Sequence, residues 1–322
     1  MLGLLEFSHL TYSQSELIDF LIQHGVIANT IKCSQCGNYI NINKNTLTYR
    51  CERQYYVKDV HKKRVCKTCH YYKSAKTGTW FHKSHLDIAT ICKIVACFLM
   101  LRHPRHEPTM DETGVASATI TDWFNFCREV CVFWADKYST KLGGPGHTVE
   151  IDEAKIGHRK YNRGRFLMGN WIFGGYERDS KKVFIVPVED RTEKTLLACI
   201  KEWILPGTTI VSDCWKSYNC LNNEDFQHLT VNHSYNFVDP ESGAHTQHIK
   251  RVWREVRANI PRYGTKSEHL LGYLSEYLFK RAYKRLERIE AFFEIIAEMY
   301  PPMSITEDQP VSSEEPGPST AR

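Results

Sequence analysis

The second half of the chain alternates short apolar runs with amphipathic stretches, a pattern typical of a sheet covered by helices. Runs of β-branched and aromatic residues predict five strands, at 148–153, 168–177, 182–188, 208–212 and 229–232. Apolar positions at helical spacing predict a helix at 193–204 and a long helix from about residue 246. Three strands, a crossover helix and two further strands describe a mixed α/β sheet with flanking helices.

The first half predicts shorter and more varied elements. Residues 13–16 (SQSE) form the capping-box pattern that begins a short amphipathic helix. We expect a hairpin over 38–57 and a long apolar helix over 85–101. The GGPG segment at 143–146 predicts a linker, so the sheet domain is expected to begin just after it.

Overall composition is ordinary for a globular protein, but the charge is unevenly placed. The 322 residues carry a net charge of +5. Residues 30–110 hold fifteen Lys and Arg against four Asp and Glu, and residues 246–290 hold eleven against five. Two basic regions favour a polyanion partner, of which nucleic acid is the commonest, and solvated helix faces are the alternative. No signal peptide or membrane span is expected, so we predict an intracellular protein, nuclear if its source is eukaryotic.

Twelve cysteines without a secretory signal indicate reduced thiols and metal ligands. Two CxxC pairs, 29 residues apart, predict a zinc ribbon closed by four thiolates: Cys33, Cys36, Cys66 and Cys69. Cys51 lies between the two pairs and competes as a ligand, and His70 is a weaker competitor. The basic residues around this ribbon are expected to contact DNA phosphates: Lys62, Lys63, Arg64, Lys67, Lys73 and Lys76.

Residues 110–127 fit a helix-turn-helix, with Gly114 in the turn and Ser117 capping the second helix. Apolar residues recur there at positions i, i+3, i+4 and i+7, which leaves Thr119 and Thr121 to face outward toward a DNA groove. Any packing of three helices could produce the same pattern.

Two aspartates mark the candidate chemistry of the sheet. Asp152 follows the apolar Val149 and Ile151, and Asp213 follows the predicted fourth strand. In an RNase H-like domain, whose strand order this pattern matches, the first and fourth strands lie side by side. Two such carboxylates form a hard-oxygen site suited to Mg²⁺ or Mn²⁺. The alternative is that each aspartate caps a helix or forms a turn.

Several segments together resemble transposases of the Merlin superfamily and their bacterial insertion-sequence relatives. The resemblance covers roughly residues 30–285, and its most specific segments are KSAKTGTWFHKSHL (73–86), VEIDEAKIGHRKYNRGR (149–165), LPGTTIVSDCWKSY (205–218), VNHSYNFVDPESGAHTQ (231–247) and LLGYLSEYLFKR (270–281). It implies a zinc-ribbon and helix-turn-helix part that binds transposon ends. It also implies an RNase H-like domain whose Asp-Asp-Glu triad holds two divalent cations for DNA strand cleavage and transfer.

The resemblance assigns Asp152 and Asp213 as the first two acids, and Lys250 stands where the family has its glutamate. An ammonium donates hydrogen bonds and cannot ligate a metal while protonated. Glu241 and Glu255 are the other acids that could serve instead. Three hypotheses stay open: an active transposase, a catalytically silent DNA-binding protein recruited by its host, and a zinc-ribbon module that binds acidic proteins.

These patterns divide the chain into five expected regions: an N-terminal helical segment (1–29), a zinc ribbon (30–83), a helix-turn-helix region (84–142), an RNase H-like domain (147–300) and a disordered acidic tail (301–322). Double-stranded DNA is the expected partner, and the protein is expected to form homo-oligomers on it.

Overall fold

The computed structural model describes residues 2–58, 60–156, 170–214, 216–232, 238–240, 243–261 and 267–302. The chain forms two compact units, one of residues 1–4 and 91–289, the other of residues 5–90 and 290–322. The predicted tail lies outside the described residues from residue 303 onward. In the part that is described, no helix combines the length and apolarity needed to cross a bilayer.

Aromatic packing between helices forms the core of the N-terminal unit. Helices α1 (Leu4–Leu10), α2 (Gln14–Gln23) and α9 (Arg288–Met299) contribute Phe7, Phe20 and Phe293. The Phe20 ring lies edge-on to the other two, with ring centroids 5.2 and 5.4 Å apart. The predicted cap of α2 is confirmed, since the Ser13 side chain accepts a hydrogen bond from the Glu16 N–H.

Three small antiparallel pairs make up the rest of this unit. They are β1 (Thr30–Lys32) with β2 (Tyr39–Asn41), β3 (Thr48–Arg50) with β6 (Tyr72–Ser74), and β4 (Gln54–Lys58) with β5 (Arg64–Thr68). The hairpin predicted over 38–57 is reduced to one bridge between Asn43 and Thr48, because the strands on either side of it pair elsewhere.

Helices α3 (Ile88–Met100), α4 (His106–Thr113) and α5 (Ser117–Tyr138) follow. Gly114 ends α4 in the left-handed conformation, at φ 64°, as the predicted turn between two helices requires. The cap differs from the prediction: Ala116 is the N-cap of α5, and no side chain bonds there. The expected apolar stripe of α5 is buried: Ile120, Trp123, Phe124 and Cys127.

A mixed five-stranded sheet forms the core of the larger unit, in the order β10-β9-β8-β12-β13. Its strands are β8 (Thr148–Ile156), β9 (Asn170–Glu177), β10 (Val183–Val188), β12 (Thr209–Asp213) and β13 (Gln227–Val231). Strand β9 runs antiparallel to its neighbours, whereas β12 runs parallel to β8 and β13. Numbered along the chain, the strands of this sheet lie in the order third, second, first, fourth and fifth. The first and fourth strands are therefore adjacent, as predicted for an RNase H-like domain.

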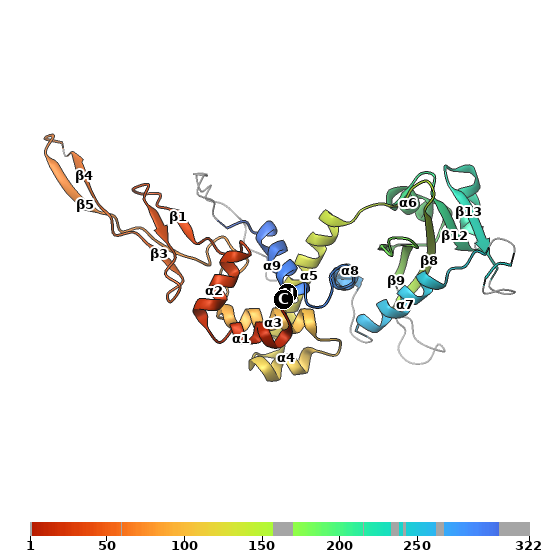
Figure 1. The fold of residues 1–322 in the computed structure, drawn as a ribbon, viewed down its shortest axis with the longest axis horizontal. Coiled ribbons are helices and arrows are strands. Elements are labelled where there is room, and N and C mark those ends of the chain that lie inside the picture. The colour runs from red at the N-terminus through yellow and green to blue at the C-terminus, as the bar shows by residue number, and fades with distance from the viewer. Residues whose placement is uncertain are drawn as a thin grey trace. The chain divides into compact units, whose positions relative to one another are not determined.

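Helices cover both faces of this sheet (Figure 1). On one face lie α7 (Gln247–Asn259) and α8 (Leu270–Ala282), whose apolar side chains pack against Ala154 and Ile172. On the other face lie α6 (Glu193–Trp203) and the 3-10 helix η2 (Lys216–Asn223), packed against Ile151 and Phe173. Two further elements, η3 (Ser267–His269) and the short parallel pair β7 (Leu142–Gly143) and β11 (Ile204–Leu205), complete the described elements of this unit.

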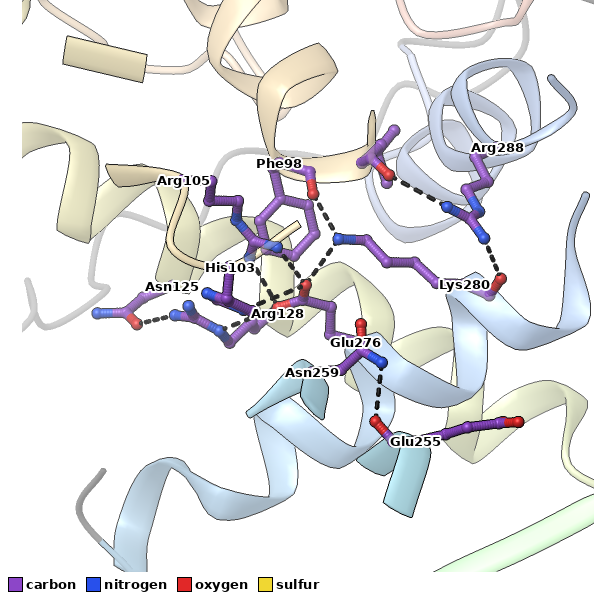
Figure 2. Close-up of polar contacts among 11 residues, drawn as sticks. Phe98, His103, Arg105, Asn125, Arg128, Glu255, Asn259, Glu276, Lys280 and Arg288 are labelled. Carbon is purple, nitrogen blue, oxygen red and sulfur yellow. Dashed lines mark hydrogen bonds and ion pairs between the residues drawn. The ribbon is translucent and has the colours of Figure 1, made fainter. Parts of the chain in front are cut away.

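A buried ionic cluster joins α8 to the α3–α4 connection and to α5. Figure 2 shows Arg105, Arg128 and Lys280 converging on the carboxylate of Glu276, which is 4% exposed. Both Arg105 amino groups donate to that carboxylate, at 2.6 and 2.9 Å, and the Lys280 ammonium donates at 2.7 Å. Burial alone would raise the pKa of Glu276, but Arg105 and Lys280 outweigh it and hold that pKa well below its usual value. Residues 91–138 are thus tied to the sheet domain inside one compact unit.

Candidate active site and cysteine cluster

Strand pairing brings the two predicted aspartates together. In the parallel register of β8 and β12, Val211 lies opposite Glu150. Asp213 and Asp152 each lie two residues further along their strands, at equivalent positions of the two adjacent strands. Asp152 does not end its strand as expected, because β8 continues for four more residues and pairs with β9 throughout.

The electrostatics of Asp152 agree with two neighbouring carboxyl groups. Burial and, to a smaller extent, the negative charge of Asp213 raise the pKa of Asp152 to about 7. The charge of Lys250 acts in the opposite direction on the same carboxyl group, so its ammonium lies near enough to Asp152 to affect it. Lys250 lies in the first turn of α7 and is exposed.

Helix α7 is anchored to the sheet by Glu150, a residue that the sequence analysis did not single out. Its carboxylate is fully buried and accepts the backbone N–H groups of His248 and Ile249, at 2.9 and 3.2 Å. Arg178 Nε and the His248 ring contact the other carboxylate oxygen, at 2.9 and 2.7 Å. A carboxylate at a helix N-terminus is favoured by the helix dipole and satisfies two N–H groups that have no partner within the helix.

Glu150, His245 and His248 also have their side-chain ligand atoms within 4.8 Å of one another, as a metal site would. The four contacts to Glu150 already use its acceptor positions, and one of them comes from the Arg178 guanidinium. We therefore interpret this group as the anchor of α7.

One turn further along α7, Trp253 completes the placement of the helix. Its indole N–H donates to Asp152 Oδ2 at 3.1 Å. The ring can approach because Gly174 faces it from β9: a Cβ at Gly174 would lie 2.7 Å from the Trp253 ring. Since Lys250 is three residues before Trp253, both side chains project from the same side of the helix toward Asp152.

A third carboxyl group, that of Glu153, belongs to this site and was missed from the sequence. The charge of Glu153 contributes to the raised pKa of Asp152, and burial and the charge of Asp213 raise the pKa of Glu153 itself, so Glu153 lies near both aspartates. Glu153 Oε1 and Asp213 Oδ1 are buried and have no hydrogen-bond partner among the residues that the structure describes. Its position next to Asp152 in the IDE triplet was the available signal. Neighbouring residues of a strand point to opposite faces of the sheet, so Glu153 is not expected to share a site with Asp152. The side chains of Asp152 and Glu153 nevertheless both reach the end of β12, one from each face.

Of the two acids considered as replacements, Glu255 is engaged elsewhere. Glu255 accepts hydrogen bonds from Arg251, Tyr277 and Arg281, at 3.2, 3.0 and 3.0 Å, on a different side of α7. Glu241 lies outside the described residues.

In the N-terminal unit, four cysteines gather, but they are not the four that the spacing predicts. The Sγ atoms of Cys33, Cys36, Cys51 and Cys69 all lie within 4.8 Å of one another. Cys33 to Cys69 and Cys36 to Cys51 are both 3.5 Å apart. Tetrahedral zinc with Zn–S bonds of about 2.3 Å separates its sulfurs by about 3.8 Å, so this set fits the ion.

Cys66 is outside this cluster, which corrects the predicted ligand set. It pairs with Tyr56 across the β4–β5 ladder, and its side chain is exposed. The strand geometry turns Cys66 away from Cys69, so Cys51 takes the fourth position. His70 is exposed.

The predicted DNA-contacting residues separate into two groups. Lys62, Lys63, Arg64 and Lys67 are exposed. Lys76 instead donates to the backbone carbonyl groups of Ser84 and Leu86, and burial lowers the pKa of Lys73. On α5, Thr119 is half-buried and Thr121 is exposed, with its hydroxyl bonded to the Ser117 carbonyl.

Comparison with known proteins agrees with this architecture. The family model described as the ISXO2-like transposase domain matches residues 141–282. An "uncharacterized transposase-like protein" of Haemophilus influenzae is 30% identical over 96 residues, which are 30% of this chain and 76% of that protein. The chain belongs to the ISXO2-like family of DDE-type transposases.

Solved structures with some similarity include two viral integrase assemblies. One is a simian T-cell lymphotropic virus intasome bound to the PP2A regulatory subunit B56 gamma, with 15% identity over 65% of this chain and 80% of that chain, at a TM-score of 0.28. The other is the HTLV-2 integrase catalytic core domain with magnesium, with 15% identity over 42% and 84%, at a TM-score of 0.23. Scores this low support no argument, and the fold assignment rests on the strand order.

Proposed function

We propose that this protein is a zinc-containing, double-stranded-DNA-binding member of the transposase family whose strand-cleaving site is disabled. The observation that carries the proposal is the position of Lys250. Lys250 lies in the first turn of α7, near Asp152, and the resemblance to the family assigns it the position of the third acid.

Asp152, Asp213 and Glu153 are the residues that would hold Mg²⁺ or Mn²⁺, and their oxygen ligands suit either ion. In a complete site of this kind, two divalent ions activate the attacking oxygen and stabilise the leaving one. A unit positive charge 4 Å from a dication is repelled by about 8 kcal/mol at an effective dielectric constant of 20. Lys250 therefore disfavours occupancy by two ions, and we expect strand cleavage and transfer to be absent or very slow.

The cysteine cluster supports the zinc part of the proposal. The thiolates of Cys33, Cys36, Cys51 and Cys69 would supply all four ligands of a tetrahedral zinc ion. A zinc ion with four protein ligands has no open position for a substrate, so the site would be structural. The ion would tie together strands that bury few side chains between them.

Exposed basic side chains support DNA as the partner. Lys62 and Lys63 lie together between β4 and β5, and phosphate contacts of this kind position a protein on DNA without reading its sequence. We also propose that α5 lies in a groove with Thr121 toward the bases, and that the protein binds as a homo-oligomer. In a eukaryotic cell such a protein acts in the nucleus.

The experiment measures retention of a 40-base-pair duplex at several salt concentrations, together with nicking of the same duplex in Mg²⁺. We expect binding that weakens steeply with salt, and no nicking. Replacing Lys62 and Lys63 with Ala should reduce the salt slope by about 2, close to one per lost phosphate contact. Salt-independent retention, or rapid Mg²⁺-dependent nicking by the unmodified protein, would refute the proposal.

A further inference from the structure

Between Cys51 and Cys69 the chain forms a projecting two-stranded ribbon, here called the hairpin arm (residues 52–68). Strands β4 and β5 pair with each other over five residues. Every described side chain from Gln54 to Thr68 is exposed or half-exposed, so neither face of the arm is buried against the described residues of its own unit. Figure 1 shows the two strands running out together beyond β3. An isolated hairpin is marginally stable in water, which indicates that a partner covers this one.

The base of the arm is held on both strands. Cys51 N–H donates to the Tyr71 carbonyl and Cys69 N–H donates to the Arg53 carbonyl, both at 2.9 Å. The thiols of the same two cysteines belong to the four-cysteine cluster. An ion in that cluster would fix the direction in which the arm leaves the unit.

The two faces of the arm differ in chemistry. Residues opposite each other in an antiparallel pair project to the same side. One face, the polar face, is therefore made by the pairs Gln54 with Thr68, Tyr56 with Cys66, and Lys58 with Arg64. The other face is made by Tyr55 with Lys67 and Val57 with Val65.

The polar face carries the groups that recognise base edges in DNA. Arg and Lys donate to guanine, Gln bonds adenine on two atoms, and Thr contacts either hydrogen-bonding groups or the thymine methyl. All six of its side chains are exposed. The Arg64 guanidinium lies 4.2 Å from the centre of the Tyr56 ring, which presents it in a fixed orientation on that face.

We infer that the hairpin arm enters the major groove of DNA and reads base edges with its polar face, through Gln54, Lys58 and Arg64. A two-stranded ribbon fits the width of that groove. The positive charge of the arm, from Arg53, Lys58, Lys62, Lys63, Arg64 and Lys67, matches the phosphates on either side. This inference rests on the DNA binding proposed above and assigns the sequence-reading element to the arm.

The test uses the full-length, zinc-loaded protein. Duplexes enriched by the protein from a random 20-base-pair library are compared with the unselected library as probes. Arg64→Ala and Lys67→Ala each remove one cation from the arm, the first from the polar face and the second from the opposite face. A zinc content of one per chain shows that each variant has folded.

We expect Arg64→Ala to lower the preference for enriched over unselected duplex by about tenfold, the effect of losing one base-edge contact. Lys67→Ala should weaken binding to both probes equally and leave the preference unchanged. Cys66, on the polar face, should react with iodoacetamide at least about fivefold more slowly when the enriched duplex is bound, because DNA covers it.

Equal preference in the two variants, or Cys66 alkylation unaffected by bound duplex, would overturn the inference. Binding of the wild type to every duplex without enrichment would also overturn it, while leaving the proposed DNA binding intact. Failure to retain any duplex would instead refute the proposed function itself.

Discussion

Five cysteines compete for four positions in the N-terminal unit, and local strand geometry decides among them. Sequence spacing favours Cys66, because it completes a second CxxC pair with Cys69. Cys66, however, lies within β5 with its side chain exposed, whereas Cys69 follows the end of that strand and is buried. Cys51 precedes β4 where the chain leaves the cluster, so its thiol reaches Cys36.

The variants Cys51→Ser and Cys66→Ser provide a matched test of this ligand set. We expect Cys66→Ser to keep one zinc per chain, and Cys51→Ser to bind zinc about 100-fold more weakly because one thiolate of four is lost. Metal analysis together with a chelator competition measures both. Zinc lost from Cys66→Ser and retained by Cys51→Ser would restore the ligand set that the spacing predicts.

Among the strands and helices, those with strong local patterns were predictable. Strands β8, β9, β10, β12 and β13 and helix α6 match their apolar runs because each buries one or both faces in the sheet domain. The N-terminal strands were not predictable, since β3 pairs with β6 across more than twenty residues and no short-range signal specifies that contact.

The candidate site was predictable only in part, for the same reason. The aspartates stand at the ends of apolar runs, so Asp152 and Asp213 could be found from the sequence. Glu150 and Glu153 could not be assigned, because their roles depend on the N-terminus of α7 and on the end of β12. Gly174 gives no local signal for its contact with Trp253, which comes from a helix about eighty residues later.

The Glu276 cluster connects α8 to segments that lie about 150 residues or more earlier in the sequence. Because the ion pairs need an ionised Glu276, the stability that they contribute depends on pH. Glu276 has a folded-state pKa below its unfolded value of 4.5. Its contribution to stability is therefore fully present above about pH 4.5, and is lost as the pH falls further.

We predict that Glu276→Gln lowers the free energy of unfolding by about 3–5 kcal/mol at pH 7, because Arg105 and Lys280 lose their buried counter-charge. The difference from wild type should shrink as the pH is lowered below about 4. Urea unfolding at several pH values measures it, with the exposed Glu202→Gln as control. A pH-independent difference, or an equal effect of Glu202→Gln, would show that the cluster has no such role.

At the scale of the whole protein, the basic hairpin arm in the N-terminal unit contrasts with an acidic site in the sheet domain. The exposed cations of the hairpin arm suit a polyanion, whereas Asp152, Glu153 and Asp213 suit cations. Lys250 reduces the negative charge of the acidic site without adding a ligand. The proposed result is a transposase-family protein that keeps DNA binding and has lost the metal-dependent reaction.

Titration of Mn²⁺, followed by the electron paramagnetic resonance signal of the free ion, tests this conclusion most directly. Wild type should bind at most one ion, in the millimolar range, and Lys250→Glu should bind two ions, the first at least about tenfold more tightly, because a cation is replaced by a ligand. Lys250→Gln, which removes the charge and adds no carboxylate, should lie between them, and Asp152→Asn should abolish binding in each background. Binding of two Mn²⁺ ions by the wild type with the affinity of Lys250→Glu would contradict the account.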